Sequence, residues 1–132
     1  MRNFTIQELT ASATAEAKRI NNDPTPEAAE NLKQLVNNVL DPLRDAYGKP
    51  IRVNSGYRSP ALNKAVKGSK TSQHLKGQAA DITAGSKQEN RKLFELAQEL
   101  NLPYCQLIDE KNFSWVHISY DKNNVKRQIL HL

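Results

Sequence analysis

A chain of 132 residues is long enough to fold as one domain around its own hydrophobic core, and a single cysteine excludes an internal disulfide and a cysteine-rich zinc site. The contents of 38% hydrophobic and 25% charged residues fit a globular protein, and no apolar run approaches the ~18 residues of a membrane helix. The net charge of +5 comes from basic residues spread along the chain, with no basic helix of interleaved aromatics, which argues against nucleic-acid binding.

Helical signals dominate the first third of the chain. Thr5 and Glu8 have the spacing of a capping box, and Thr25 followed by Pro26 is typical of a helix start. Apolar residues then recur at three- and four-residue steps, which predicts one long amphipathic helix ending near Gly48. The positions on this apolar face are Leu32, Leu35, Val36, Val39, Leu40 and Leu43.

The rest of the chain alternates strands with loops and two further helices. "PIRVNSGYRS" predicts a short strand that runs into a turn, Pro60 opens a brief helix ended by Gly68, and residues 68–78 have the composition of a loop. "AADITA" predicts a strand, Ser86 caps a second amphipathic helix, and "YCQLI", "WVHISY" and "QIL" predict three short strands, the first holding Cys105 as a buried core residue. We therefore expect a single α+β domain over residues 1–132, with a small, largely antiparallel sheet and helices packed on one side.

Two of the three histidines stand in segments whose pattern serves no obvious structural purpose. Within "SQHLKGQAAD", His74 lies in the predicted loop and Asp81 in the strand that follows it, and His117 shares one face of the "WVHIS" strand with Trp115. His131 is next to last, where chain ends fray, and we do not expect it to take part.

Catalytic zinc usually takes three protein ligands from His, Asp and Glu, and His74, Asp81 and His117 form such a set. By spacing alone, the more common explanation of such a His–Asp pair is hydrogen bonding at the surface.

Three stretches in order, "SGYRS", "SQHLKGQAAD" and "WVHIS", resemble the signature of the zinc D-alanyl-D-alanine carboxypeptidase family. That family includes phage cell-wall endopeptidases and vancomycin-resistance D,D-dipeptidases, and it shares its fold with the Hedgehog signalling domain. Its pattern is S-x-H-x-x-G-x-A-x-D with a downstream W-x-H. This chain meets every fixed position, at Ser72, His74, Gly77, Ala79, Asp81, Trp115 and His117.

The resemblance implies a Hedgehog/DD-peptidase-like fold and one Zn²⁺ ion bound by His74, Asp81 and His117. It implies a zinc metallopeptidase that hydrolyses peptide bonds in peptidoglycan stem peptides, as a D-Ala-D-Ala carboxypeptidase or a cell-wall endopeptidase. Arg58 matches the arginine that holds the substrate carboxylate or polarises the scissile carbonyl, and Ser72 and Trp115 are expected to contact substrate. A zinc-binding, non-catalytic module of the same fold is the alternative.

The general base is the position where this chain departs from the family pattern. Many members have Glu or Asp three residues before the last histidine, and this chain has Ser114 there, which cannot take a proton at neutral pH as a carboxylate can. The nearest carboxylates are Asp109 and Glu110, and strand alternation puts them on opposite faces. Short members often read Q-L-I-x-E before W-V-H, so we expect Glu110 as the base, with Asp109 as the alternative.

The resemblance also implies where the protein acts and with what. We expect a peptidoglycan peptide as substrate, no nucleic acid, no transmembrane segment and a monomer. The N-terminus has no continuous apolar segment of the kind found in a secretory signal. We therefore expect a protein that stays cytoplasmic until it is released, as a phage or prophage endolysin, or that acts at the cell wall. The sequence leaves open which peptidoglycan bond is cut.

Overall fold

The computed structural model describes residues 1–132 and confirms an α+β fold built on a five-stranded sheet. The strands lie in the order β1-β2-β4-β3-β5, and all neighbours are antiparallel except β3 and β5, which are parallel. None of the helices is both long enough and apolar enough to cross a bilayer. The strands are β1 (Arg52–Ser55), β2 (Ala79–Thr83), β3 (Gln106–Glu110), β4 (Trp115–Ser119) and β5 (Gln128–His131), and the helices are α1 (Ile6–Thr10), α2 (Ala13–Lys18), α3 (Pro26–Leu35), α4 (Asp41–Tyr47), α5 (Pro60–Ala65) and α6 (Lys87–Glu99).

The long helix predicted from the apolar periodicity forms as α3 and α4 joined by a π-helical turn at Val36–Leu40. The Thr25 hydroxyl accepts a hydrogen bond from the Ala28 amide at its start, and Gly48 ends it with a φ of +77°. Pro42 explains the π turn, because a proline inside a helix has no N–H and crowds the carbonyl four residues earlier. All six apolar positions predicted for this face are at most 1% exposed.

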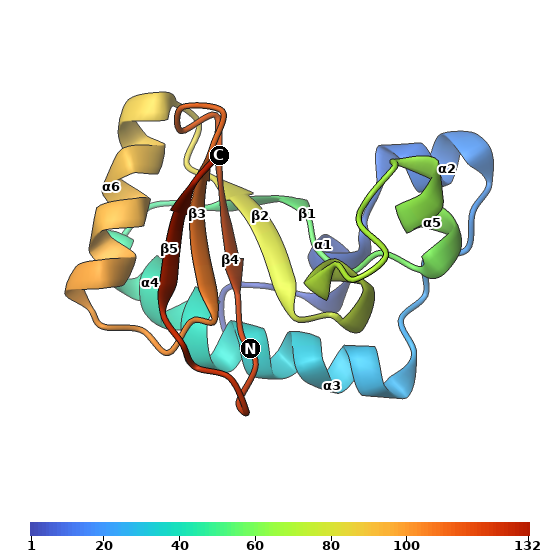
Figure 1. Ribbon diagram of the computed structural model, residues 1–132, viewed down its shortest axis with the longest axis horizontal. Helices are drawn as coiled ribbons and strands as arrows, with labels where there is room; N and C mark the ends of the chain where they lie inside the picture. The colour runs from blue at the N-terminus through green and yellow to red at the C-terminus, as the bar shows by residue number, and fades with distance from the viewer.

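The sheet has one face against the helices and one face that carries polar side chains. α3, α4 and α6 pack on the first face, while α1, α2 and α5 gather beyond its β1–β2 end (Figure 1). Alternate strand residues, among them Ile82, Leu107 and Ile118, are fully buried in the core with Leu32 and Leu93. The intervening residues, among them Asp81, Glu110 and His117, therefore point to the opposite face.

Two sequence predictions need correction. Residues 73–76, predicted as loop, form a 3₁₀ turn, because Ser72 caps the turn and Gly77 closes it in the left-handed conformation. His131, predicted to fray, belongs to β5, where it lies opposite Asp109 and forms an ion pair with it. The C-terminal residues are ordered because β5 pairs with β3, and the Leu132 amide donates to the Asp109 carbonyl at 2.8 Å.

Candidate metal centre

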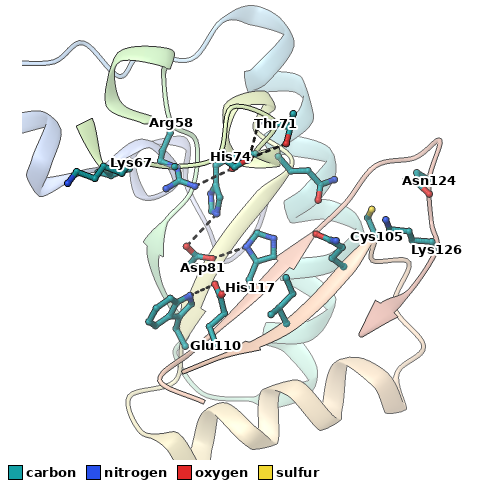
Figure 2. A pocket seen from close by; sticks show the side chains of 18 residues that line it. Arg58, Lys67, Thr71, His74, Asp81, Cys105, Glu110, His117, Asn124 and Lys126 are labelled. Carbon is teal, nitrogen blue, oxygen red and sulfur yellow. Dashed lines mark hydrogen bonds and ion pairs between the residues drawn. The ribbon is translucent and has the colours of Figure 1, made fainter. Parts of the chain in front are cut away.

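The two predicted histidines and the predicted aspartate converge on the polar face of the sheet. Asp81 on β2 lies directly opposite His117 on β4, and His74 comes from the 3₁₀ turn just before β2. One nitrogen or oxygen from each of the three lies within 4.8 Å of the others (Figure 2). Because β2 and β4 are neighbours, the sheet register rather than the loop sets the His117–Asp81 spacing.

Asp81 is the central group of this cluster. Its Oδ1 lies 3.0 Å from His117 Nδ1, and its Oδ2 lies 3.4 Å from His74 Nε2. Burial alone raises the pKa of Asp81, but the hydrogen bonds and positive charge of His117 and His74 outweigh burial and bring the pKa below its ordinary value. The carboxylate is therefore ionised in this setting, as a metal ligand must be.

The orientation of His74 fits a metal site. His74 Nδ1 lies 2.7 Å from the carbonyl oxygen of Gly56, so this nitrogen carries the proton and donates. The other nitrogen, Nε2, lies 3.4 Å from Asp81 Oδ2, so in the neutral tautomer its lone pair and the carboxylate would both be available to one metal ion. Two imidazoles and one carboxylate are a donor set that suits Zn²⁺ and leaves a fourth position for water.

Two glycines make this geometry possible. A Cβ on Gly56 would lie 2.2 Å from the Leu9 carbonyl oxygen, so only glycine lets this backbone approach α1 while its own carbonyl holds His74. Gly77 has a φ of +71°, and a Cβ there would lie 2.4 Å from the Ala28 carbonyl oxygen. Gly77 thus brings the turn that carries His74 onto α3.

Arg58 lies beside the cluster and has no carboxylate of its own. Its backbone amide donates to the His74 carbonyl at 3.0 Å, and its Nη2 donates to Ser72 Oγ at 3.2 Å. Its Nε is buried without a hydrogen-bond partner, and burial lowers the pKa of the guanidinium, with the charge of Asp81 opposing that shift. Ser72 Oγ also accepts from the His74 amide, so it connects the arginine to the turn.

The two candidate bases lie on opposite faces of β3. Glu110 lines the same cleft as the metal cluster, and its Oε2 accepts a hydrogen bond of 3.0 Å from Trp115 Nε1 (Figure 2). Asp109 points to the helix face, is 6% exposed and pairs with His131. Ser114 lies in the turn before β4, where its hydroxyl donates to the Lys111 carbonyl at 2.7 Å. Glu110 is therefore the candidate base that reaches the cleft.

The cleft has a volume of about 780 Å³, enough for several peptide residues. Trp115, expected to contact substrate, makes its one side-chain hydrogen bond to Glu110. The cleft also holds residues that the sequence reasoning did not single out. Strand alternation could have identified Gln106 and Ile108, which share a face with Glu110, whereas no sequence signal marked the loop residues Lys67, Asn124 and Lys126.

Comparison with known proteins gives the family of the chain. The family profile of peptidase M15 matches residues 2–119. A stretch of 48 residues is 50% identical to a zinc D-Ala-D-Ala carboxypeptidase of Streptomyces albus G. That stretch is 36% of this chain and 19% of the relative, so the match spans about a fifth of the relative's length. These similarities and the His–Asp–His cluster support a zinc peptidase, and the chain belongs to the peptidase M15 family.

Proposed function

We propose that this protein is a zinc-dependent peptidase that hydrolyses peptide bonds in peptidoglycan stem peptides. The observation that carries the proposal is the His74–Asp81–His117 cluster in one cleft with an ionisable carboxylate, Glu110, and an uncompensated guanidinium, Arg58. A metal site used only for structure is normally closed by a fourth protein ligand. Here three ligands face an open cleft, which favours catalysis.

When bound, Zn²⁺ lowers the pKa of a water molecule towards ~7 and polarises the scissile carbonyl. We assign the proton transfer to Glu110, which takes a proton from the attacking water and returns it to the leaving amine. The hydrogen bond from Trp115 occupies Oε2 and fixes the carboxylate plane, which leaves Oε1 for the proton. Asp109 lies outside the cleft and is not part of this step.

Arg58 is assigned to the substrate. Its planar, permanently charged guanidinium can donate two hydrogen bonds to the carboxylate of a peptide or to the oxyanion that develops during attack. Half-burial strengthens this contact, since less water competes for the guanidinium. Ser72 holds Arg58 in place through its hydroxyl and thereby couples the substrate contact to the turn that carries His74.

The substrate class rests on similarity to proteins that act on D-Ala-D-Ala and on cell-wall peptides. Terminal D-Ala-D-Ala trimming and cleavage within stem peptides or crosslinks are both compatible with the open cleft. The proposed place of action is the cell wall, with release as an endolysin as one route to it. A zinc-binding module without activity remains the second reading, because Ser114 stands where many members carry the base.

The proposal is tested by metal analysis and muropeptide digestion on one preparation. The wild type should carry about one zinc per chain and cleave muropeptides, and His117→Ala should lose both zinc and cleavage. His131→Ala is the matched control: it also removes a histidine, but one that faces α6, so zinc and cleavage should persist. Zinc bound by the wild type without any cleavage would favour the non-catalytic module.

A further inference from the structure

The segment that begins at Arg58 and runs along one side of the cleft is rich in basic residues. Residues 58–78, here called the basic lobe, comprise α5, the 3₁₀ turn and the loops that join them to the sheet. The lobe contains five of the 19 basic residues and no acidic one, which leaves 14 basic residues to balance the 14 acidic residues elsewhere. The basic excess, expected from the sequence to be spread along the chain, is therefore concentrated beside the metal centre.

The lysines of the lobe have no counter-charges within the protein. The lysine ion pairs of the structure join Lys49 and Lys92 to Glu89, and none involves the lobe. Lys64, Lys67 and Lys70 are all exposed. Cations gathered without partners create a positive potential that attracts an anionic ligand.

These three lysines line a groove of about 540 Å³ that adjoins the metal cleft. Lys67 and Gly68 line both hollows, so the groove and the cleft adjoin at these two residues. In Figure 2 the Lys67 side chain is directed away from the metal ligands. The groove therefore borders the cleft at Lys67 and Gly68.

The lobe is held in shape, so the lysine positions are defined. Asn63 is 5% exposed, its Nδ2 donates to the Ser69 carbonyl at 3.0 Å, and its own carbonyl accepts from the Gly68 amide at 2.8 Å. These bonds tie the end of α5 to the loop that carries Lys70. Side chains on one face of an extended substrate peptide recur about every 7 Å. The lysine side chains are long and flexible, so their ammonium groups can match this spacing.

We propose that this lysine groove extends the substrate site and binds carboxylates of the peptide that lie away from the bond to be cleaved. The preferred substrate is then a peptide with several free carboxylates, one at Arg58 and others at Lys64, Lys67 and Lys70. This inference rests on the proposed peptidase function. It adds that the site prefers substrates with a high negative charge.

The test compares two synthetic stem-type peptides with the same scissile bond and the same terminal carboxylate. In one peptide the remaining carboxylates are free, and in the other they are amides. Lys64→Gln/Lys70→Gln changes groove residues that do not line the metal cleft. Lys33→Gln/Lys87→Gln removes the same charge from exposed positions outside both hollows.

The groove variant should lose about three- to tenfold in kcat/KM on the free-carboxylate peptide, through KM, as expected for two exposed ion pairs. It should cleave the amidated peptide at the wild-type rate, and the loss should shrink in high salt because exposed charges are screened. The control variant should match the wild type on both peptides. Equal losses on both peptides, or no loss on either, would overturn the proposal.

Direct binding separates this inference from the proposed function. If the wild type cleaves neither peptide, the peptidase proposal fails, while fluorescence anisotropy still measures binding of the labelled free-carboxylate peptide. The groove variant should then bind it about three- to tenfold more weakly than the wild type and the control. Equal binding by all three proteins would refute the carboxylate site. Inorganic polyphosphate and unlabelled peptide are also compared as competitors of the labelled peptide. If polyphosphate displaces it at far lower concentrations than unlabelled peptide does, and only when the groove lysines are present, the groove binds a phosphate polymer and the proposal is refuted.

Discussion

The hydrogen bond from Trp115 to Glu110 gives the sharpest prediction about how the base works. Trp115→Phe keeps the aromatic ring and removes the N–H that donates to Glu110 Oε2 at 3.0 Å. A hydrogen bond to a charged group contributes about 1.5–3 kcal/mol, and partial exposure of both side chains lowers this to roughly 1–2 kcal/mol. If the whole effect falls on the transition state, kcat should drop about five- to thirtyfold.

The assay is steady-state cleavage of a muropeptide by proteins with equal zinc content. Trp115→Phe should lower kcat with little change in KM, because a base acts in the chemical step rather than in binding. Lys111→Ala is the matched control, since the Lys111 ammonium lies 5.6 Å from the centre of the Trp115 ring and the variant leaves the indole N–H in place. The control should retain wild-type kcat.

A double-mutant cycle decides whether Trp115 acts through Glu110. In a Glu110→Gln background the base is already lost, so adding Trp115→Phe should cost little more. The single indole of the chain also reports the contact directly, because its Nε1 proton resonance should shift in Glu110→Gln. A full five- to thirtyfold loss in the Glu110→Gln background, or an unmoved indole resonance, would refute the positioning role.

Four further outcomes follow from other parts of the structure. Glu110→Gln should keep its zinc and lose about 10²–10⁴ in kcat, whereas Asp109→Asn should keep kcat and lower the melting temperature; the reverse pattern would move the base to Asp109. Arg58→Lys should raise KM or lower kcat despite its equal charge, since an ammonium lacks the planar fork, and unchanged kinetics would remove Arg58 from the substrate site. Lysine and tyrosine hydrogen bonds lower the pKa of Glu89 to about 2, so the stability that Glu89 provides is present above pH 4.5 and lost as pH falls towards 2. Thermal melts of Glu89→Gln and wild type should therefore differ at pH 7 and converge near pH 2, and a difference that persists at pH 2 would contradict this assignment. Gly77→Ala should destabilise the fold by at least about 1 kcal/mol, seen as a lower denaturation midpoint, because of the positive φ and the Ala28 carbonyl; an unchanged midpoint would contradict that geometry.

Sequence patterns predicted the local elements well, because each rests on short-range physics. Helix caps such as Thr25 and Ser86 accept hydrogen bonds from the amides expected to lie within their reach. The apolar steps from Leu32 to Leu43 bury one continuous face. The π turn was not predicted, since its cause is a clash between Pro42 and the preceding turn rather than a periodic pattern.

The parts of the site that depend on strand order could not be predicted from the sequence alone. His117 faces Asp81 only because β4 inserts between β2 and β3, an order that no spacing in the chain specifies. The pairing of β5 was not predictable from the sequence either. Its parallel pairing with β3 orders the C-terminal residues and brings His131 next to Asp109. Strand alternation, by contrast, was enough to put Glu110 and Asp109 on opposite faces once β3 was recognised.

The dependence of cleavage on the metal is tested by removing zinc and restoring it. Muropeptides are digested by the protein as purified, after chelation and dialysis, and after one equivalent of Zn²⁺ is restored, and the products are identified by mass spectrometry. We expect fragments whose masses sum to that of the substrate plus one water. They should disappear in the chelated sample and return with zinc in the wild type but not in His74→Ala. Cleavage that persists in the zinc-free protein, or that returns with zinc in His74→Ala, would contradict this expectation.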